Sequence, residues 1–351
     1  MTQTKTNTVT FIDPKDMRWA LFGRHIYHDH LIKNLANEGF PPPIVIVDPD
    51  EQYERDKRLL SKHGLFSDLE AFERDSLIEK HTFSTVNDEA CLKLLKDRGC
   101  NMGFSIACRS IFKTPIIDFF NSALFNLHDS FLPEERGGAL NSWRILNDVN
   151  TVGATIHLLE EGIDTGAIMF RSKREVMKTL PKPIDYDIAQ LECAHVILDQ
   201  FIDAVISGDT VESIPQDNDT SLYFPRLYTE LNGAINFNWS AVDIEKFVRA
   251  FSDPYPGAFT LKNDLKIFID EVELVSESTF HPFCNGRVVT VLEDGAVNVI
   301  AGNGMLRIRT VIVDGCKYKA SAYLDIRDVL HTPASILEEA LLSVPNVRTM
   351  Q

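Results

Sequence analysis

Short, continuous apolar runs alternate with segments of helical periodicity through the first half of the chain. The runs "MRWALFG" at 17–23, "IVIVD" at 44–48, "MGFSIA" at 102–107 and "SALFNLH" at 122–128 are each long enough for one strand. Strands that are covered on both faces are apolar at every position, and intervening helices supply the crossovers that parallel strands need. The pattern therefore predicts an α/β fold with a mostly parallel sheet.

Helical segments separate these runs. Asn87 is a suitable N-cap for a helix that ends at Arg98, before Gly99. Residues 50–82 are charged and predicted to be largely helical. The clearest helix begins at Ile184 and ends at Ser207 and Gly208, and we expect one face of it to be apolar: Ile188, Leu191, His195, Leu198, Ile202 and Val205.

The pattern changes in the second half. "PQDNDTSL" at 215–222 is polar, and from about Ala258 short strands are separated by turns such as "EDG" and "VDG". We place the boundary between about 210 and 235. The predicted domains are 1–220, an α/β domain, and 221–351, a small β-barrel-like domain.

Composition limits the partners and the compartment. The formal net charge is −16, and from Arg226 onward 12 Lys and Arg stand against 16 Asp and Glu, which argues against nucleic acid binding. The six cysteines show no C-x-x-C spacing, and we interpret them as reduced thiols of a cytoplasmic protein. The chain shows neither a signal peptide nor an apolar run of roughly 20 residues that could cross a membrane. His25, His28 and His30 lack the further ligands of a metal site, so no metal is predicted.

Three polar residues end the fourth apolar run at alternate positions: Asn126, His128 and Ser130. Parallel sheets place their ligands at the carboxyl ends of strands, and alternate side chains share one face. His can act as a base near neutral pH, and Asn offers an uncharged donor for a developing oxyanion. The pair is suited to attack on a carbonyl group.

A carboxylate follows the next apolar strand. Asp164 lies in a turn between Gly162 and Gly166, where the backbone can bend sharply and a ligand can approach its amides. An Asp in such a turn can orient His128 or share a proton with it.

Structural interpretations stand beside these. Asn126 and His128 alone can simply cap a strand, and Ser130 is favoured as a turn residue that binds nearby backbone. Arg136 can either tie down its loop or bind a ligand. His157 is favoured as a packed histidine of a strand.

The motifs around these residues resemble those of a known family. "FNLHDSFLPEERGG" at 125–138 is similar to the N-x-H-x-S-L-L-P-x-x-R-G signature of the N10-formyltetrahydrofolate-dependent formyltransferases. "GATIHLLEEGIDTGAI" at 153–168 resembles their second block, at the same separation. Residues 223–260 are similar to the junction in methionyl-tRNA formyltransferases and in enzymes that formylate nucleotide-linked amino sugars. The likeness covers most of residues 17–330 and is weakest over 50–100.

The resemblance implies a Rossmann-like catalytic domain, a small OB-like β-barrel, and N10-formyltetrahydrofolate as co-substrate. It implies that His128 takes a proton from the attacking amine, that Asn126 donates to the oxyanion, and that Asp164 orients His128. The folate is expected to contact Phe104, Ser105, Ile106, Arg109, Glu160, Gly162 and Ile163. The acceptor is expected to contact Ser130, Arg136 and Gly137.

The acceptor stays open among several alternatives. We favour the primary amine of an amino sugar carried on a nucleotide, because the C-terminal part is acidic and lacks the basic insertion expected for gripping tRNA. A methionyl-tRNA formyltransferase, an enzyme for another small amine, and a catalytically silent binding module are the alternatives. Asp129, Phe131 and Glu135 depart from the family pattern, and the added negative charge lies beside the expected acceptor entrance. A homodimer is left open.

Overall fold

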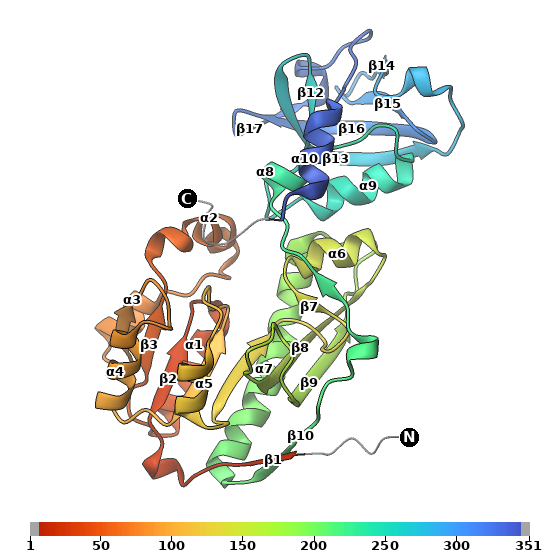
Figure 1. Cartoon of the computed structure of the whole chain (residues 1–351). Helices are drawn as coiled ribbons and strands as arrows, with labels where there is room; N and C mark the ends of the chain where they lie inside the picture. The colour runs from red at the N-terminus through yellow and green to blue at the C-terminus, as the bar shows by residue number, and fades with distance from the viewer. Residues whose placement is uncertain (1–6, 345–351) are drawn as a thin grey trace.

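The computed structural model describes residues 7–344, and within them the chain forms two units (Figure 1). The N-terminal unit contains a sheet with helices on both faces. The C-terminal unit, drawn in cyan and blue, contains a second sheet that lies beyond the α6 end of the first unit. A short two-stranded pairing closes the other end of the N-terminal unit, between β1 (Asn7–Thr10) and β10 (Thr210–Ser213).

The main sheet has seven strands in the order β4-β3-β2-β5-β6-β8-β9. The pairings from β4 to β6 are parallel, whereas β8 is antiparallel to both β6 and β9. The predicted mostly parallel α/β sheet is therefore confirmed, with two antiparallel strands at one edge. The strands are β2 (Trp19–Phe22), β3 (Ile44–Val47), β4 (Glu79–Thr82), β5 (Met102–Ile106), β6 (Leu124–His128), β8 (Thr151–Leu158) and β9 (Ile168–Glu175).

Alternate residues of each central strand pack into separate cores on the two faces of the sheet. On β2, Trp19 and Leu21 belong to the cluster beneath α1 and α7, whereas Ala20 and Phe22 belong to the cluster beneath α4 and α5. This double coverage is why the strands are apolar at every position. The helices of this unit are α1 (Ile26–Asn37), α2 (Glu54–Leu60), α3 (Leu69–Arg74), α4 (Glu89–Asp97), α5 (Thr114–Phe120), α6 (Leu140–Leu146) and α7 (Pro183–Ser207).

Two details of the predicted helices are wrong. The N-cap of α4 is Asp88, whose side chain accepts from the amide of Ala90, while Asn87 instead donates to the carbonyl of Ile111. In α7 the expected face is rotated at its start, because Ile188 is 50% exposed. The core side of α7 there is formed by Tyr186, Gln190 and Cys193.

The C-terminal unit is built on a six-stranded antiparallel sheet. Its order is β12-β13-β16-β15-β14, and β17 also pairs with β16. Three helices lie beside it, and one of them, α9, packs between this sheet and α6 (Figure 1). The elements are α8 (Thr229–Asn232), α9 (Ala241–Ala250), β12 (Ala258–Lys262), β13 (Leu265–Ser276), β14 (Val288–Val291), β15 (Val297–Ala301), β16 (Gly304–Val313), β17 (Cys316–Lys319) and α10 (Ala334–Leu342).

The connection between the units stays attached to the first one. β11 (Tyr223–Phe224) pairs in parallel with β7 (Arg136–Gly137), so the chain passes along the N-terminal unit before α8 begins. The predicted division at residue 220 stays a prediction.

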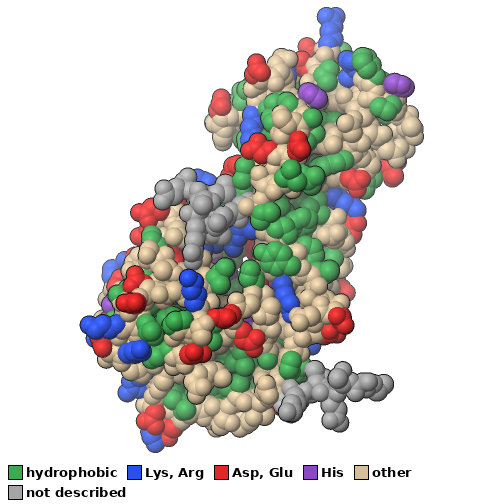
Figure 2. Space-filling view, in the orientation of Figure 1, with side chains coloured by type: hydrophobic (Ala, Val, Ile, Leu, Met, Phe, Trp, Pro, Cys, Tyr) green, Lys and Arg blue, Asp and Glu red, His purple; other side chains and the backbone are tan. Residues whose placement is uncertain are grey.

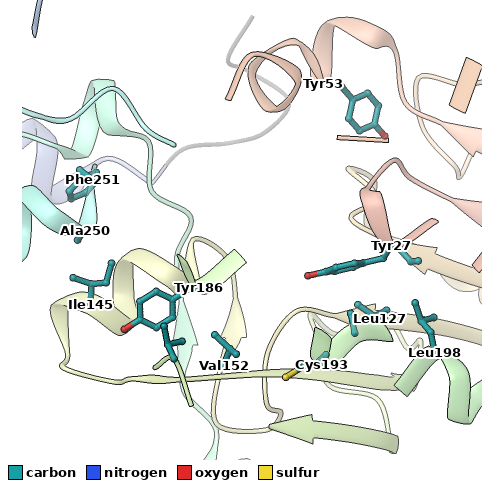
Figure 3. Packing of buried hydrophobic residues seen from close by; sticks show 14 of the residues in the cluster. Tyr27, Tyr53, Leu127, Ile145, Val152, Tyr186, Cys193, Leu198, Ala250 and Phe251 are labelled. Carbon is teal, nitrogen blue, oxygen red and sulfur yellow. The ribbon is translucent and has the colours of Figure 1, made fainter. Parts of the chain in front are cut away.

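One apolar core runs through both units. Ile145 of α6 and Tyr186 of α7 lie close to Ala250 and Phe251 of the C-terminal unit (Figure 3). The hydroxyl of Ser142 adds a hydrogen bond of 2.8 Å to the carbonyl of Ala250. The junction between the units is therefore packed like an interior.

All six cysteines are free. Within residues 7–344 no helix combines the length and the apolar character that a membrane crossing requires.

Candidate active site

The carboxyl end of β6 presents Asn126 and His128 on one face of the main sheet. Phe125 and Leu127 point into the core under α1 and α7, so the two polar side chains face the opposite side, which they share with Leu124. Residues Asn126 and His157 are register partners across β6 and β8. The alternation predicted from the sequence thus brings both polar groups to the edge where parallel sheets bind ligands.

His128 lies between a backbone carbonyl and a carboxylate. Its Nε2 is 3.1 Å from the carbonyl oxygen of Glu135, and its Nδ1 is 3.6 Å from Oδ1 of Asp164. A carbonyl oxygen only accepts, so Nε2 carries the proton in the neutral ring and Nδ1 has the free lone pair. The side chain of His128 is 8% exposed. Nδ1 is therefore the basic atom, and it faces Asp164.

The turn that carries Asp164 is fixed from three directions. Oδ2 of Asp164 accepts a 3.1 Å hydrogen bond from the amide of Gly137. The backbone carbonyl of Asp164 accepts one of 2.8 Å from the side chain of Gln216. Asp164 has a φ of 53°, in the left-handed region. A Cβ at Gly162 would come within 2.1 Å of Thr165 Oγ1, so a larger residue there would require the Thr165 side chain to move. These contacts hold the carboxylate toward His128.

Asn126 has a partner that the sequence interpretation did not assign. Its Nδ2 lies 3.1 Å from Nε2 of His157, whose Nδ1 is 2.7 Å from the carbonyl of Leu158. That carbonyl requires a proton on Nδ1, so Nε2 accepts from Asn126. Burial lowers the pKa of His157 to about 4, which keeps its ring neutral. The favoured interpretation of His157 as a packed histidine missed this contact.

Hydrogen bonds of buried side chains fix the loop after His128. Ser130 is fully buried and donates to the carbonyl of Glu135, and Thr155 donates to the carbonyl of Ser130. Arg136 is also buried, and its guanidinium donates to the side-chain oxygens of Gln216 and Asn218. Both side chains therefore hold the loop in place, and the predicted substrate contact of Ser130 is not supported.

Glu135 forms an ion pair with α6. Its carboxylate accepts two hydrogen bonds from Arg144, of 3.0 and 2.5 Å, and the Arg144 side chain is only 1% exposed. The negative charge that we expected beside the acceptor entrance is therefore compensated at Glu135. Nothing in the order of the chain indicated this pair.

Models of one family cover most of the chain. The model described as "Formyl transferase" matches residues 20–185, and the one described as "Formyl transferase, C-terminal domain" matches residues 229–326. The chain belongs to the formyltransferase family. The resemblance of its two sequence blocks is thereby confirmed, and so is the expectation that it is a formyltransferase.

Relatives of this formyltransferase include methionyl-tRNA formyltransferases and sugar N-formyltransferases. A methionyl-tRNA formyltransferase of Ruminiclostridium cellulolyticum is 25% identical over 286 residues, which cover 82% of this chain and 88% of that protein. Two solved structures, each with a TM-score of 0.58, cover 83% of this chain. One is WlaRD, a sugar 3N-formyl transferase with dTDP and 5-N-formyl-THF (22% identity, 96% of that chain covered). The other is an N-formyltransferase from Helicobacter canadensis with folinic acid and dTDP-3-aminofucose (20% identity, 98% covered). The two structures share the fold of this formyltransferase.

The residues expected to contact folate lie in two environments. The side chains of Phe104 and Ile106 are buried in the core under α1 and α7, and Ser105, the register partner of Asn126, is buried as well. Glu160 and Gly162 are exposed in the turn before Asp164, and Ile163 is 46% exposed. An exposed apolar side chain beside the carboxylate of Asp164 fits contact with a ligand. Arg109 is paired with Asp56, outside this turn.

A cavity of the formyltransferase lies behind the loop 131–137, which follows the candidate residue His128 and which we call the catalytic loop. It has a volume of about 440 Å³ and is mainly apolar. The catalytic loop, α6, β8 and the connection to the second unit contribute its walls, among them Phe131, Glu135, Trp143, Arg144, Leu222 and Phe224. This cavity and the His128–Asp164 contact share the loop 131–137 as a common wall.

Proposed function

We propose that this formyltransferase transfers a formyl group from N10-formyltetrahydrofolate to the primary amine of an amino sugar carried on a nucleotide. The observation that carries the proposal is the approach of His128 Nδ1 to Asp164, with Asn126 beside them on the same strand end. The two solved relatives, whose descriptions name a formyl-folate and dTDP or a dTDP-sugar, support the choice of donor and acceptor.

The donor supplies the formyl carbon when bound. At the site, Nδ1 of His128 accepts the proton that the attacking amine must lose. The resulting imidazolium lies 3.6 Å from Asp164, and attraction of about 4 kcal/mol is typical at such a range near a protein surface. Asn126 uses one Nδ2 hydrogen on His157 and keeps the second for an oxyanion. These roles of His128, Asn126 and Asp164 are part of the proposal.

Single-turnover formyl transfer tests the chemistry. His128→Ala is expected to reduce the rate by roughly 10²–10⁴ through loss of the base. Asn126→Ala is expected to cost on the order of 10²–10³ through loss of an oxyanion donor. His331→Ala, at an exposed histidine, is the control. Rates within about threefold of the wild type for the first two variants would contradict the assignment.

The acceptor is tested separately. The 25% identity to a methionyl-tRNA formyltransferase keeps tRNA as the second candidate, whereas the acidic C-terminal part favours a nucleotide-linked sugar. We expect nucleotide-linked amino sugars to be formylated and initiator tRNA to show no specific filter binding at two salt concentrations. Salt-dependent tRNA binding together with formylation of its aminoacyl group would favour the second candidate.

Three finer expectations belong to the same proposal. We propose that the C-terminal sheet closes toward an OB-like barrel, that the enzyme acts in the cytoplasm, and that it can form a homodimer. Solution scattering tests whether the protein forms a dimer, and fractionation of cells tests the compartment.

A further inference from the structure

Three arginines from distant parts of the chain gather beside the catalytic loop. Arg55 lies on α2, Arg109 follows β5, and Arg226 lies in the connection to the C-terminal unit. Asp56, next to Arg55, forms the ion pair with Arg109 and is also one of the charges that act on Arg226. In Figure 2 basic side chains are visible in a hollow below the junction of the two units.

Tyrosine rings stack against two of these guanidinium groups, those of Arg55 and Arg109. The guanidinium of Arg55 lies 4.4 Å from the ring centre of Tyr228 and 5.6 Å from that of Tyr255. That of Arg109 lies 5.5 Å from the ring of Tyr53. Stacking of this kind leaves the edges of a guanidinium free to donate hydrogen bonds.

Within residues 7–344, only Arg109 of this arginine cluster (Arg55, Arg109 and Arg226) has a close ion pair. Arg55 has only a distant contact of 4.0 Å with Glu230, and Asp56 pairs with Arg109. Arg226 is partly buried and makes no hydrogen bond or ion pair with any of residues 7–344. Burial and the neighbouring Arg109 both lower the pKa of Arg226. Two like charges thus lie near each other at a cost that an anion would remove.

Donors in the arginine cluster are also left unused. Nε and Nη2 of Arg55 and Nε of Arg109 are buried and have no hydrogen-bond partner among the described residues. The Arg109 side chain is only 7% exposed. A buried N–H group without a partner costs free energy, more so when it is charged. Unpaired donors of this kind fit an acceptor that the protein itself does not provide.

The arginine cluster adjoins the reacting groups. Gly138, which follows the catalytic loop, lies against Arg226, since a Cβ at this glycine would be 3.5 Å from Nε of the arginine. Asp129, the residue after His128, is among the charges that act on Arg226. An anion held by the cluster would therefore lie next to the catalytic loop.

We propose that Arg55, Arg109 and Arg226 bind the diphosphate of the nucleotide that carries the acceptor amine. This inference rests on the proposed function and names a subsite for its substrate. Guanidinium groups match phosphate oxygens through paired N–H donors. In a nucleotide-linked sugar the diphosphate is joined directly to the sugar, so a diphosphate held here would place the sugar beside the catalytic loop.

Titration calorimetry with thymidine diphosphate, uridine diphosphate and thymidine tests the inference. Arg226→Gln is expected to weaken binding of the nucleoside diphosphates at least about tenfold, because a hydrogen bond to a charged group is lost, and to leave thymidine binding unchanged. Arg55→Gln is expected to act in the same direction. Arg58→Gln, an exposed arginine on the same helix, is the matched control. Binding of 5-formyltetrahydrofolate monitors the integrity of the fold.

The outcomes separate this inference from the proposed function. Equal binding of a nucleoside diphosphate by the wild type and Arg226→Gln would overturn the inference and leave the proposed acceptor intact. If no nucleoside diphosphate binds and Arg226→Gln weakens initiator tRNA instead, both the inference and the proposed acceptor fail. Absence of binding by all of these probes to the wild type also overturns the inference.

Discussion

At the scale of single residues, His157 fixes the orientation of the Asn126 carboxamide. Its Nδ1–H donates to Leu158 and its Nε2 accepts from Asn126, so the amide cannot exchange its oxygen and nitrogen without losing a bond. A neutral ring is required for this arrangement, and burial provides it by lowering the pKa to about 4. His157 is thus a positioning residue for the proposed oxyanion donor.

Replacing His157 tests this role. His157→Leu is expected to lower kcat about fivefold, since one hydrogen bond of about 1 kcal/mol orients the amide, with little change in KM. His157→Gln offers a carbonyl oxygen to Asn126 and is expected to retain more activity. Steady-state kinetics at saturating donor measure both variants, with His331→Leu as control. Equal losses for Leu and Gln would argue for a purely structural role.

The buried carboxyl group of Asp187 makes the stability of the folded state depend on pH. Burial, with a smaller contribution from the charge of Asp129, raises its pKa to about 7. The folded state then binds this proton more tightly than the unfolded state, so the stability it contributes is full below about pH 4 and is lost as the pH rises through about 7. Asp187 accepts a 2.6 Å hydrogen bond from Asn141, which an asparagine oxygen can also accept.

Asp187→Asn is accordingly expected to be more stable than the wild type at about pH 8, by roughly 1–2 kcal/mol for a partly exposed group. The difference should shrink as the pH falls and disappear near pH 4. Denaturant unfolding at the two pH values measures it, and Asp209→Asn, an exposed carboxylate, is the control. A difference that does not depend on pH would contradict the assignment.

At the scale of elements, Arg144 connects α6 to the catalytic loop. The Glu135–Arg144 pair is buried, and the carbonyl of the same Glu135 accepts from His128. Removing one member of a buried ion pair leaves the other charge without a partner, at a cost of about 3–5 kcal/mol. The position of the loop therefore depends on both members.

A double-mutant cycle tests this connection. Arg144→Leu alone is expected to be strongly destabilising, whereas Glu135→Phe with Arg144→Leu is expected to recover much of the loss, because no buried charge remains. Melting temperatures measure the effect. Trp143→Phe, on the same helix, keeps an aromatic side chain and serves as control. A double variant less stable than Arg144→Leu would contradict the expected coupling.

The elements that the sequence predicts best are those whose pattern is local. Apolar runs marked the strands, and the ends of β6 and β8 marked His128 and the turn of Asp164, because alternation and glycines are visible within a few residues. The face of α7 could not be assigned, because apolar side chains lie all round that helix and only packing selects Tyr186 over Ile188.

Contacts between residues that are far apart in the sequence could not be predicted, because no local pattern indicates them. His157 meets Asn126 only because β8 runs antiparallel to β6, and a run that is buried on both faces does not reveal its direction. Glu135 and Arg144 are nine positions apart on a loop and a helix, a spacing with no standard meaning. Arg55, Arg109 and Arg226 come together only when the connection between the units is in place.

At the scale of the whole molecule, the two units share one core, and this determines how the chain should unfold. Phe251 is 2% exposed and belongs to the same apolar cluster as Ile145 and Tyr186 of the N-terminal unit. Domains whose interface is large and apolar lose independence, because neither can unfold without exposing the other.

We expect one calorimetric transition for the full chain. Phe251→Ala should lower the free energy of unfolding by about 3–5 kcal/mol, because buried surface is lost and a cavity is left at the junction. Phe283→Ala, at a phenylalanine that is 76% exposed, should leave the transition almost unchanged. If Phe251→Ala instead shifts one of two resolved transitions, the units are energetically separate and the shared core does not couple them.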